Sequence, residues 1–549
     1  MNLLLVFSFL FAGKIDLGTK PVWESNDNDY STGGVMADID NDGDLDLVTG
    51  NGNDMARDKN TVYYNNNKQL ETTASWSSAD SACNAHISLG DMDADGDLDL
   101  AVAGFALDGA WVSDPSRVYK NEAGRYSATP SWIHADTMQA FSCDWGDADG
   151  DGDLDLAIAS GNDYIKRKQK VIIYENINFD LSANLMWKST DSDYNMDVCW
   201  VDIDNDGDLD LAVGGYGTNR IYFAENGKLD TIAGWVSADK HHTVQIAFAD
   251  FDNDGDMDMA AADNNQKADD TSKIRIYLNQ NGTLDTLPFW ESKLWRYQSC
   301  VAWGDADGDG DLDLAAGGWW EKACVYENKQ GKFDTLPAWS WKPSNPQDIV
   351  CEQFIWTEIN GDNWKEAREN FQVSAGKVIY TSHFPLLDII EVKINNQLAS
   401  SQDYLWNPAD GWIQFNQSGN AEIHYRYSQY PDLLLTNWQR NRGNFAFHNL
   451  LADSNSIAET HYDVADISLA KTLIPKGKAI ELSFSIPNEE LMTIALFDVS
   501  GRKLAEYNNL TVSKGLLKLD FNTSILSSGV YLIHIVRKTS SKTLRIQVI

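Results

Sequence analysis

Six short loops hold the residues of this sequence that are best suited to chemistry. The first, residues 38–46, reads D-I-D-N-D-G-D-L-D. Near-identical copies begin at Asp91, Asp147, Asp202, Asp250 and Asp305. Aspartates at positions 1, 3, 5 and 9 gather several hard oxygen atoms around one point, and glycine at position 6 permits a sharp turn. The pattern predicts a calcium site in each loop, with position 7 offering its backbone carbonyl.

Other interpretations of these loops fit the sequence less well. An EF-hand or dockerin-type loop needs a glutamate at position 12 and a helix on each side. Position 12 is threonine or an apolar residue in every copy, and the segment that follows is short, apolar and rich in small residues, which predicts a strand. Magnesium prefers fewer protein ligands and more retained waters. An acidic turn without an ion is disfavoured because five aspartates within nine residues repel one another unless a cation binds them.

A seventh, degraded copy begins at Glu358 and reads E-I-N-G-D-N-W-K-E. Its candidate ligands would be Glu358, Asn360, Asp362 and Glu366. Since the pattern is incomplete, an empty loop fits as well as a weak ion site, and we assign no site there.

Composition limits the classes of protein that are possible. The 549 residues are 43% hydrophobic, enough for two or more domains with sizeable cores, and the formal net charge is −39. One divalent ion in each of six loops would change the net charge only to −27. The excess acidity argues for a soluble chain and against nucleic acid as a partner.

The loops belong to a repeat of about 50 residues. A tryptophan precedes position 1 by 15 residues in all six copies, and an aromatic strand such as Val118-Tyr119 follows most of the loops. Each unit therefore contains four short antiparallel strands, the content of one propeller blade. Seven units closed into a ring leave no open sheet edge. Because the strand around Trp23 precedes the first loop, we expect it to complete the seventh blade.

These loops resemble the FG-GAP or VCBS repeats of bacterial surface proteins and of the integrin alpha-subunit propeller. The resemblance covers residues 20–383 and implies a seven-bladed, calcium-binding β-propeller in an all-β protein. It carries the metal-ligand role over to positions 1, 3, 5, 7 and 9 of each loop. These positions are Asp38, Asp40, Asp42, Asp44 and Asp46; Asp91, Asp93, Asp95, Asp97 and Asp99; Asp147, Asp149, Asp151, Asp153 and Asp155; Asp202, Asp204, Asp206, Asp208 and Asp210; Asp250, Asp252, Asp254, Asp256 and Asp258; and Asp305, Asp307, Asp309, Asp311 and Asp313.

The rest of the chain follows a different pattern. Residues 385–430 alternate like a small β module, and the polar segment 431–475 is typical of a linker. Residues 476–549 predict a compact β-sandwich. Within them LFDVSGRKL, LSSGVYLIHI and KTSSKTLRIQVI resemble the C-terminal sorting domain of type IX secretion cargo, which implies contact with the secretion machinery and a place outside a bacterial cell or on its outer membrane.

The N-terminal residues 1–13 (MNLLLVFSFLFAG) have the apolar run of an export signal but no basic residue before it, and a buried strand is the alternative. No other segment approaches the length of a membrane span, so we expect none in the mature chain. The six cysteines, at positions 83, 143, 199, 300, 324 and 351, have no metal-site spacing. Most fall on core strands of different repeats, usually too far apart to bridge, so buried free thiols are expected.

The sequence favours binding over catalysis. No nucleophile elbow, HExxH motif or phosphate loop accompanies the nine histidines. Segments that vary between repeats should gather at the end of the ring away from the ion loops, where recognition of a protein or glycan is expected. Candidate residues on this face are Trp111, Tyr164, Trp295, Arg296, Tyr297, Trp319, Trp320 and Trp341. A calcium-dependent polysaccharide-degrading enzyme, resembling some lyases, and a purely structural surface protein are the alternatives.

Overall fold

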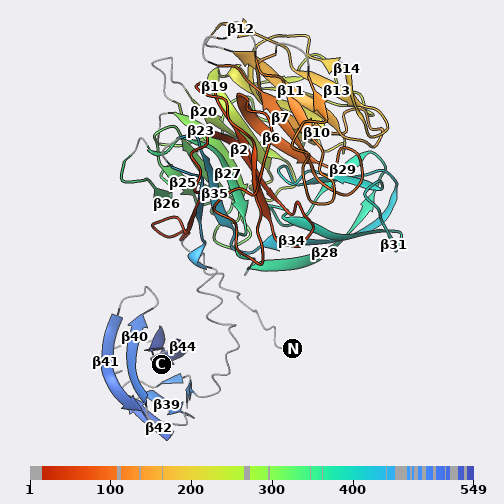
Figure 1. Cartoon of the computed structure of the whole chain (residues 1–549). Coiled ribbons are helices and arrows are strands. Elements are labelled where there is room, and N and C mark those ends of the chain that lie inside the picture. Colours follow the sequence, from red (N-terminus) through yellow and green to blue (C-terminus); the bar gives the residue numbers. More distant parts are fainter. Residues whose placement is uncertain are drawn as a thin grey trace. The chain divides into compact units, whose positions relative to one another are not determined.

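The computed structural model describes two units, residues 15–451 of the first and the strands of residues 467–548 in the second (Figure 1). Within the first unit the description omits 108–109, 111–112, 135–137, 163–164, 265–271, 295–296, 346–347, 362 and 440–441. The predicted export signal, residues 1–13, lies outside the described residues. The regular elements of the described residues are almost all β-strands, which confirms the predicted all-β fold class.

Seven sets of four antiparallel strands form the blades of a propeller-like ring. Blade 1 contains β2 (Ser31–Ala37), β3 (Asp46–Asn51), β4 (Thr61–Tyr63) and β5 (Trp76–Ser77); blade 2 contains β6 (Asn84–Gly90), β7 (Asp99–Gly104), β8 (Arg117–Tyr119) and β9 (Trp132–Ile133); blade 3 contains β10 (Ala140–Gly146), β11 (Asp155–Asn162), β13 (Ile172–Asn176) and β14 (Leu181–Lys188), with β12 (Arg167–Lys168) added to β11.

Blades 4 to 6 repeat this order, whereas the strands of blade 7 come from three separate parts of the chain. Blade 4 contains β15 (Tyr194–Val201), β16 (Asp210–Gly217), β17 (Arg220–Tyr222) and β18 (Trp235–Val236); blade 5 contains β19 (His241–Ala249), β20 (Asp258–Asp263), β21 (Ile274–Tyr277) and β22 (Trp290–Glu291); blade 6 contains β23 (Gln298–Gly304), β24 (Asp313–Gly318), β25 (Ala323–Tyr326) and β26 (Trp339–Trp341); blade 7 contains β27 (Cys351–Thr357), β35 (Asp432–Asn437), β36 (Phe445–Phe447) and β1 (Trp23–Glu24). The first strands of successive blades contact one another, and β27 contacts β2, so the ring is closed.

The N-terminal strand closes the ring as the register of the repeat predicts. In blade 7, β1 pairs antiparallel with β36 through Trp23 opposite Ala446, although the two are far apart in the sequence. Pairing the first strand of the chain with the last blade leaves no free edge between the ends of the ring.

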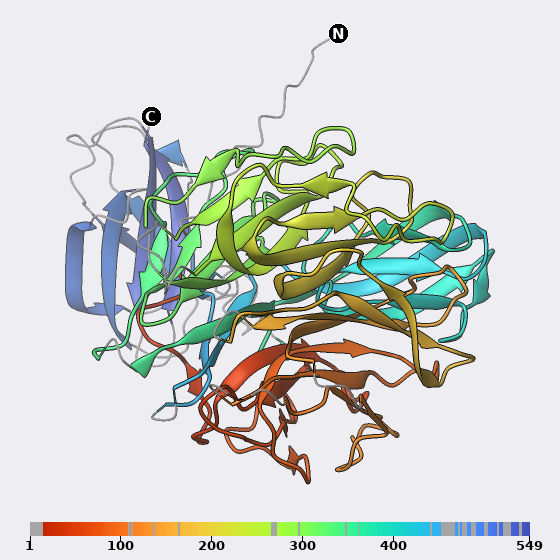
Figure 2. The same ribbon diagram turned by 90° about the horizontal axis from the view of Figure 1, so that it is seen from above.

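A two-sheet insertion interrupts blade 7 between β27 and β35. Its strands are β28 (Trp364–Val373), β29 (Lys377–Tyr380), β30 (Asp388–Ile394), β31 (Gln397–Leu398), β32 (Tyr404–Trp406), β33 (Trp412–Phe415) and β34 (Gly419–Ser428). They form the sheets β28-β34-β30-β31 and β29-β33-β32. Ile423 of one sheet and Phe415 of the other belong to one buried apolar cluster, so the sheets share a core. Figures 1 and 2 show this insertion, coloured cyan, beside the blade strands.

The insertion corrects three predicted boundaries. The propeller does not end at residue 383, because β35 and β36 belong to blade 7. The module predicted at 385–430 begins earlier, at β28, and is inserted into blade 7. The predicted linker 431–475 contains β35 and β36, two strands of that blade. The segment Val378–Tyr380 has the aromatic pattern of the third strand of a repeat, but in β29 it pairs with β33 of the insertion.

Every blade is joined to the next by an aromatic contact. The tryptophan of each outer strand meets, edge-on or tilted, the aromatic ring of the third strand in the following blade, with ring centroids 5.0–6.2 Å apart. Trp23 with Tyr63 makes this contact where the ring closes. Because such pairs bury large apolar surfaces in a preferred geometry, they explain why the tryptophan recurs with the loops.

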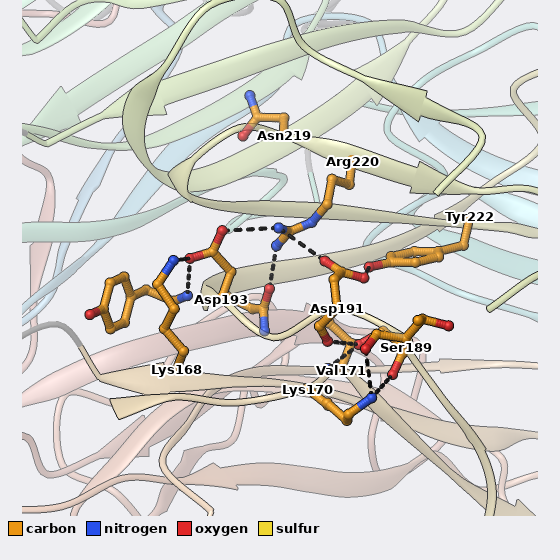
Figure 3. Close-up of polar contacts among 12 residues, drawn as sticks. Lys168, Lys170, Val171, Ser189, Asp191, Asp193, Asn219, Arg220 and Tyr222 are labelled. Atoms are coloured by element: carbon orange, nitrogen blue, oxygen red, sulfur yellow. Dashed lines mark hydrogen bonds and ion pairs between the residues drawn. The ribbon is translucent and has the colours of Figure 1, made fainter. Parts of the chain in front are cut away.

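Polar contacts reinforce the boundary between blades 3 and 4 (Figure 3). The Tyr222 hydroxyl donates to Asp191, which also pairs with Arg220 at 3.2 Å. Arg220 reaches Asp193 at 3.2 Å, and Lys168 pairs with the other oxygen of Asp193 at 2.7 Å. The two blades are therefore joined by a charged network as well as by the aromatic pair.

The strands that the structure describes in the C-terminal unit number eight and form two sheets. The first sheet contains β37 (Ile467–Leu469), β39 (Ile480–Phe484) and β42 (Gly515–Leu519); the second contains β38 (Leu473–Ile474), β44 (Ser541–Val548), β43 (Gly529–Val536), β40 (Glu490–Asp498) and β41 (Lys503–Val512). Two of these strands, β37 and β38, fall in the segment predicted as a linker.

Candidate functional sites: the acidic loops and the central funnel

The six acidic loops share one backbone geometry. In each loop the amide of the position 6 glycine donates to the position 1 carboxylate, at 2.9–3.0 Å. That glycine has a φ of 88–98° in every loop, and the residue at position 4 is also left-handed, as in Asn41 at 58°. Two left-handed residues turn the chain sharply, and at position 6 a Cβ atom would be strained in every loop.

The carboxylates at positions 1, 3, 5 and 9 converge within the loops. Oxygens of Asp38, Asp40 and Asp42 lie within 4.8 Å of one another, as do those of Asp91, Asp93 and Asp99. Among the described residues, no hydrogen-bond donor reaches the buried Oδ1 atoms at position 3, those of Asp40, Asp93, Asp252 and Asp307. Buried oxygens without a donor are costly, and a hard cation at the centre of the loop would satisfy them. The donor set fits calcium.

Burial changes the acidity of these groups. It raises the pKa of Asp38 to about 6 and that of Asp46 to about 8, with neighbouring carboxylates adding to the shift. The corresponding aspartates of the other loops shift in the same direction. Desolvated like charges favour the protonated form unless a cation offsets them.

The aspartates at positions 7 and 9 also accept structural hydrogen bonds that the sequence pattern did not predict. Asp46 at position 9 accepts the amides of Ile39 and Asn65 at 3.1 and 2.7 Å, so it ties the loop to the end of the third strand. At position 7, Asp97 accepts a hydrogen bond from Asn41 of the preceding blade at 2.7 Å. Equivalent bonds join loops 4 and 5 and loops 5 and 6. Three pairs of neighbouring loops are therefore joined directly.

Asparagines after the aromatic strands add a second set of contacts between blades. Asn121 donates through its side chain to the carbonyl of Ile39, position 2 of the preceding loop, at 3.0 Å. Five further asparagines repeat this bond, including Asn65 to Ile359 at the closure. Blade 4 has Ala224 at this place and lacks the side-chain bond.

The seventh loop is completed by a residue far along the chain. Asp432 accepts the amides of Ile359 and Asn449 at 3.0 and 2.8 Å, the two bonds that position 9 makes in the other loops. Glu358 holds position 1 and is fully buried, which raises its pKa to about 8. The whole insertion lies between them.

The ligand set considered for the seventh copy is therefore wrong. Glu366 belongs to β28, where its carboxylate contacts His424 at 2.9 Å, and Asp362 lies outside the described residues. The sequence did contain the correct signal. Residues 432–437 (DLLLTN) match Asp46 to Asn51 (DLVTGN), and FAFHN at 445–449 matches TVYYN at 61–65.

The insertion covers the end of the ring that carries the acidic loops. Lys377 pairs with Asp208 at 2.7 Å, Gln414 donates to Asp147 at 2.7 Å, and Arg426 donates to the carbonyl of Gly43 at 3.2 Å. Tyr380, Leu386 and Asp410 line the same inner cavity as Trp200 and Gln245 of the first strands. This end of the central channel is thus closed by protein.

A funnel lies at the other end of the channel, where the first strands begin and the second strands end. It is lined by residues of all seven blades: Thr32, Asn53, Asp54, Asn84, Ala85, His86, Phe105, Phe141, Met196, Tyr216, Val244, Trp319, Glu352 and Trp438. The Phe105 and Phe141 rings lie 4.3 Å apart, and those of Trp319 and Trp438 lie 5.3 Å apart. The funnel therefore combines aromatic pairs with a few polar groups, as small-ligand sites do.

One acidic group of the funnel is shielded from water. Glu352 accepts a hydrogen bond from the Trp319 indole at 2.5 Å, and burial raises its pKa to about 8, with Asp54 adding to the shift. At ordinary pH this carboxyl group is therefore largely able to donate as well as accept a hydrogen bond.

The structure separates the residues predicted for a ligand face. Trp319 lines the funnel, and Trp320 lies next to it, against Tyr297. The prediction for Trp341 is wrong, because this side chain is buried against Phe445 and Phe447. The candidates Trp111, Tyr164, Trp295 and Arg296 lie outside the described residues. The other aromatic residues of the funnel were missed although the sequence contains a signal for most of them. Phe105, Tyr216, Trp319 and Trp438 each lie six residues after the position 9 aspartate, but the residue type at this place varies from blade to blade.

Family profiles match both units of the chain. The FG-GAP-like repeat matches residues 38–102 and 202–261, and the secretion system C-terminal sorting domain matches residues 474–549. The chain contains FG-GAP-like repeats and a type IX sorting domain. The resemblances stated from the loops and from the C-terminal strands are confirmed.

Comparison with solved structures gives neighbours of low sequence identity and low structural similarity. The crystal structure of BBS1N in complex with ARL6DN, soaked with mercury, is 11% identical, with a TM-score of 0.40 over 75% of this chain and 94% of that one. The same complex soaked with lead is 11% identical, with a TM-score of 0.40 over 74% of this chain and 95% of that one. No curated protein matches the sequence.

The sorting domain places the FG-GAP-like protein outside the cell. Such domains mark cargo that the type IX system secretes to the extracellular space or the cell surface. Among the residues that the structure describes, no helix has the length and apolar character needed to cross a membrane.

Proposed function

We propose that this secreted FG-GAP-like protein is a calcium-stabilised, non-enzymatic binding protein that recognises a glycan through its central funnel. The observation that carries the proposal is the contrast between the two ends of the channel. One end is covered by the insertion, and the other is a funnel with a side chain from every blade. Variable residues on a repeated scaffold are where recognition usually lies.

Calcium has a structural role in this proposal. One ion in each of the six loops would be held by positions 1, 3, 5 and 9, with the unpartnered position 3 oxygens as its most direct ligands. Extracellular calcium fills even weak sites, and an ion that binds only the folded chain stabilises it. A carboxylate that binds a cation stays ionised, so these aspartates would be poor general acids.

The chemistry of the funnel suits a sugar. The faces of Trp319 and Trp438 offer flat apolar surface for the C–H face of a pyranose ring, while Glu352 and Asn53 offer hydrogen bonds to hydroxyl groups. Its closed inner end would admit the terminus of a glycan chain rather than its middle. A protein partner would have to insert a single side chain or a chain end.

A glycan array followed by calorimetry tests the proposal. We expect the full chain in calcium to bind a defined set of glycan termini, and Trp438→Ala to weaken binding at least about tenfold, as for other central aromatic anchors. Ile232→Ala is a matched control, since Ile232 is 69% exposed and does not line the funnel. An array without hits, or equal affinity of the Trp438 variant, would overturn the proposal; a hit only on a protein array would indicate a protein ligand.

A polysaccharide-degrading enzyme is the second candidate, and one observation favours it. Tyr216 and His86 both line the funnel, and His86 lies 3.4 Å from Asp197. A lyase needs a proton acceptor beside an aromatic cleft. Turnover of a panel of uronic-acid polysaccharides, lost in Tyr216→Phe and His86→Gln, would establish this function instead of simple binding.

A further inference from the structure

Two of the six cysteines come together between blades. The Sγ atoms of Cys300 and Cys351 lie 3.1 Å apart, and both side chains are fully buried. This corrects the expectation that cysteines of different repeats are too far apart to bridge. Cys143, Cys199 and Cys324 instead contact oxygen acceptors.

The backbone around the pair is held in place. Cys300 lies in β23 and Cys351 begins β27, the first strands of blades 6 and 7. The Ser299 hydroxyl donates to the carbonyl of Cys351 at 2.5 Å and fixes the two strands at this point. Each strand also has a register shift beside its cysteine. A disulfide has an S–S bond of about 2.05 Å, so closing the pair requires a movement of only about 1 Å.

The destination of the chain favours oxidation. The sorting domain sends it out of the cytoplasm, and disulfides form and persist in the periplasm and at cell surfaces. A thiol pair in contact within a cytoplasmic protein would stay reduced, whereas in exported cargo it meets oxidising partners.

We propose that Cys300 and Cys351 form a disulfide that joins blade 6 to blade 7 in the exported protein. In the reaction, the thiolate of one cysteine attacks the disulfide of an oxidised thiol–disulfide oxidoreductase of the cell envelope and forms a mixed disulfide. The thiolate of the second cysteine then displaces the oxidoreductase, which leaves as a dithiol. The two cysteines together lose two protons and two electrons, and the oxidoreductase disulfide gains them.

The bond forms before blade 7 is completely folded. Both sulfur atoms are inaccessible in the closed ring, and burial raises the pKa of Cys351 well above its ordinary value, so the folded thiol reacts slowly. The bridge closes a loop of about 50 residues that ends at the blade completed by the N-terminal strand. It would therefore restrict the opening of the ring beside its closure.

Peptide mapping of the full-length chain, secreted by a type IX host and never reduced, tests this inference. We expect a cross-linked peptide pair containing Cys300 and Cys351, and four cysteines that react with iodoacetamide after denaturation. Alkylation of all six cysteines in the denatured, unreduced chain would overturn the proposal.

Thermal melts in calcium provide a second measurement. Reduction with a small dithiol should lower the melting temperature of the natural chain by about 5 °C and leave the Cys300→Ala/Cys351→Ala double variant unchanged. Cys324→Ala, which keeps the bridge, should respond to the dithiol like the natural chain. If the double variant does not fold, the peptide map of the natural chain still decides the question.

Discussion

The two ends of the FG-GAP-like ring use the same strands for different purposes. At the loop end, one nine-residue pattern occurs six times. Its hydrogen bonds and ion pairs are made within the loop, with the neighbouring loop or with the insertion, and the buried position 3 oxygens that receive no donor suit an ion. At the funnel end, Phe105, Tyr216 and Trp438 occupy the same place in the repeat, six residues after position 9, but the residue type there changes from blade to blade. The residue types that every blade needs in order to fold are repeated. The residue types that line the funnel vary, so this surface is free to suit a ligand.

Removing calcium should lower the melting temperature more than any other change, and it acts only at the loop end of the ring. With excess chelator, we expect the melting temperature of the first unit to fall by more than about 10 °C, since each of several ions contributes about 1–3 kcal/mol at saturation. Calorimetry in calcium and in chelator measures the shift, with magnesium added back as the control. An unchanged melting temperature would show that the loops hold no stabilising metal ion.

The seventh loop should depend on Asp432 instead of an ion. We expect Asp432→Ala to lower the unfolding free energy by about 3 kcal/mol, because the fully buried carboxylate accepts two amides and contacts His448 at 2.9 Å. Urea melts measure the loss, and Asp334→Ala is the control, with a side chain 78% exposed. Similar melts for both variants would contradict the role of Asp432 in completing the loop.

At the funnel end, stability should depend on the protonation of Glu352. The folded pKa of about 8 lies above the ordinary value of 4.5, so the folded protein keeps a proton that the unfolded chain releases. The unfolding free energy of the natural chain should therefore fall as the pH rises from about 4.5 to 8. Glu352→Gln has no proton to lose on unfolding, so its unfolding free energy should exceed that of the natural chain by about 4 kcal/mol at pH 8 and be nearly equal to it at pH 4.5.

Urea melts of both chains at the two pH values, in calcium so that the loops stay ionised, measure this difference. If it does not change with pH, the carboxyl group of Glu352 is ionised in the folded protein.

A single loop variant tests whether the two ends are independent. Asp252→Asn replaces one position 3 carboxylate whose buried oxygen receives no hydrogen bond from the described residues. It should weaken one ion site and lower the unfolding free energy by about 1–2 kcal/mol in calcium. Its glycan affinity, measured by calorimetry, should equal that of the natural chain. A matched loss of affinity would show that the loops and the funnel are coupled.

The smallest effect is expected where the insertion meets the loops. Lys377→Met removes the ion pair with Asp208, but the lysine side chain is 34% exposed, so water and salt screen the pair. We expect a loss under about 1 kcal/mol that disappears at high salt, measured by thermal melts at two ionic strengths. A larger loss that salt does not reduce would mean that Lys377 contributes mainly by packing on Gly207.

Much of this molecule could be predicted because its signals are local. The glycine at position 6 turns each loop sharply. In the first loop, Asp38 accepts a hydrogen bond from the amide of Gly43, only five residues away, so the loop forms from its own sequence. The strand after each loop and the tryptophan before it repeat with the same spacing. The C-terminal strands were predicted for the same reason, by regular alternation and turn residues.

The prediction for blade 7 was wrong because its contacts are not local. Between Glu358 and Asp432 the chain forms two further sheets, and the fit of Val378–Tyr380 to the repeat concealed the continuation at residues 432–449. The dockings of Gln414 on Asp147 and of Arg426 on Gly43 have no sequence pattern at all.

The sequence by itself determined the acidic loops, the four-strand unit, the closure by Trp23 and the export of the protein, since each depends on residues close together or on a repeated spacing. Only the tertiary structure decided that Asp432 completes the seventh loop, that the insertion covers the loop end, that Cys300 meets Cys351, and that Trp319, Trp438 and Glu352 share a funnel. These contacts arise when the ring closes and brings segments more than 30 residues apart, in one case more than 300, to one place.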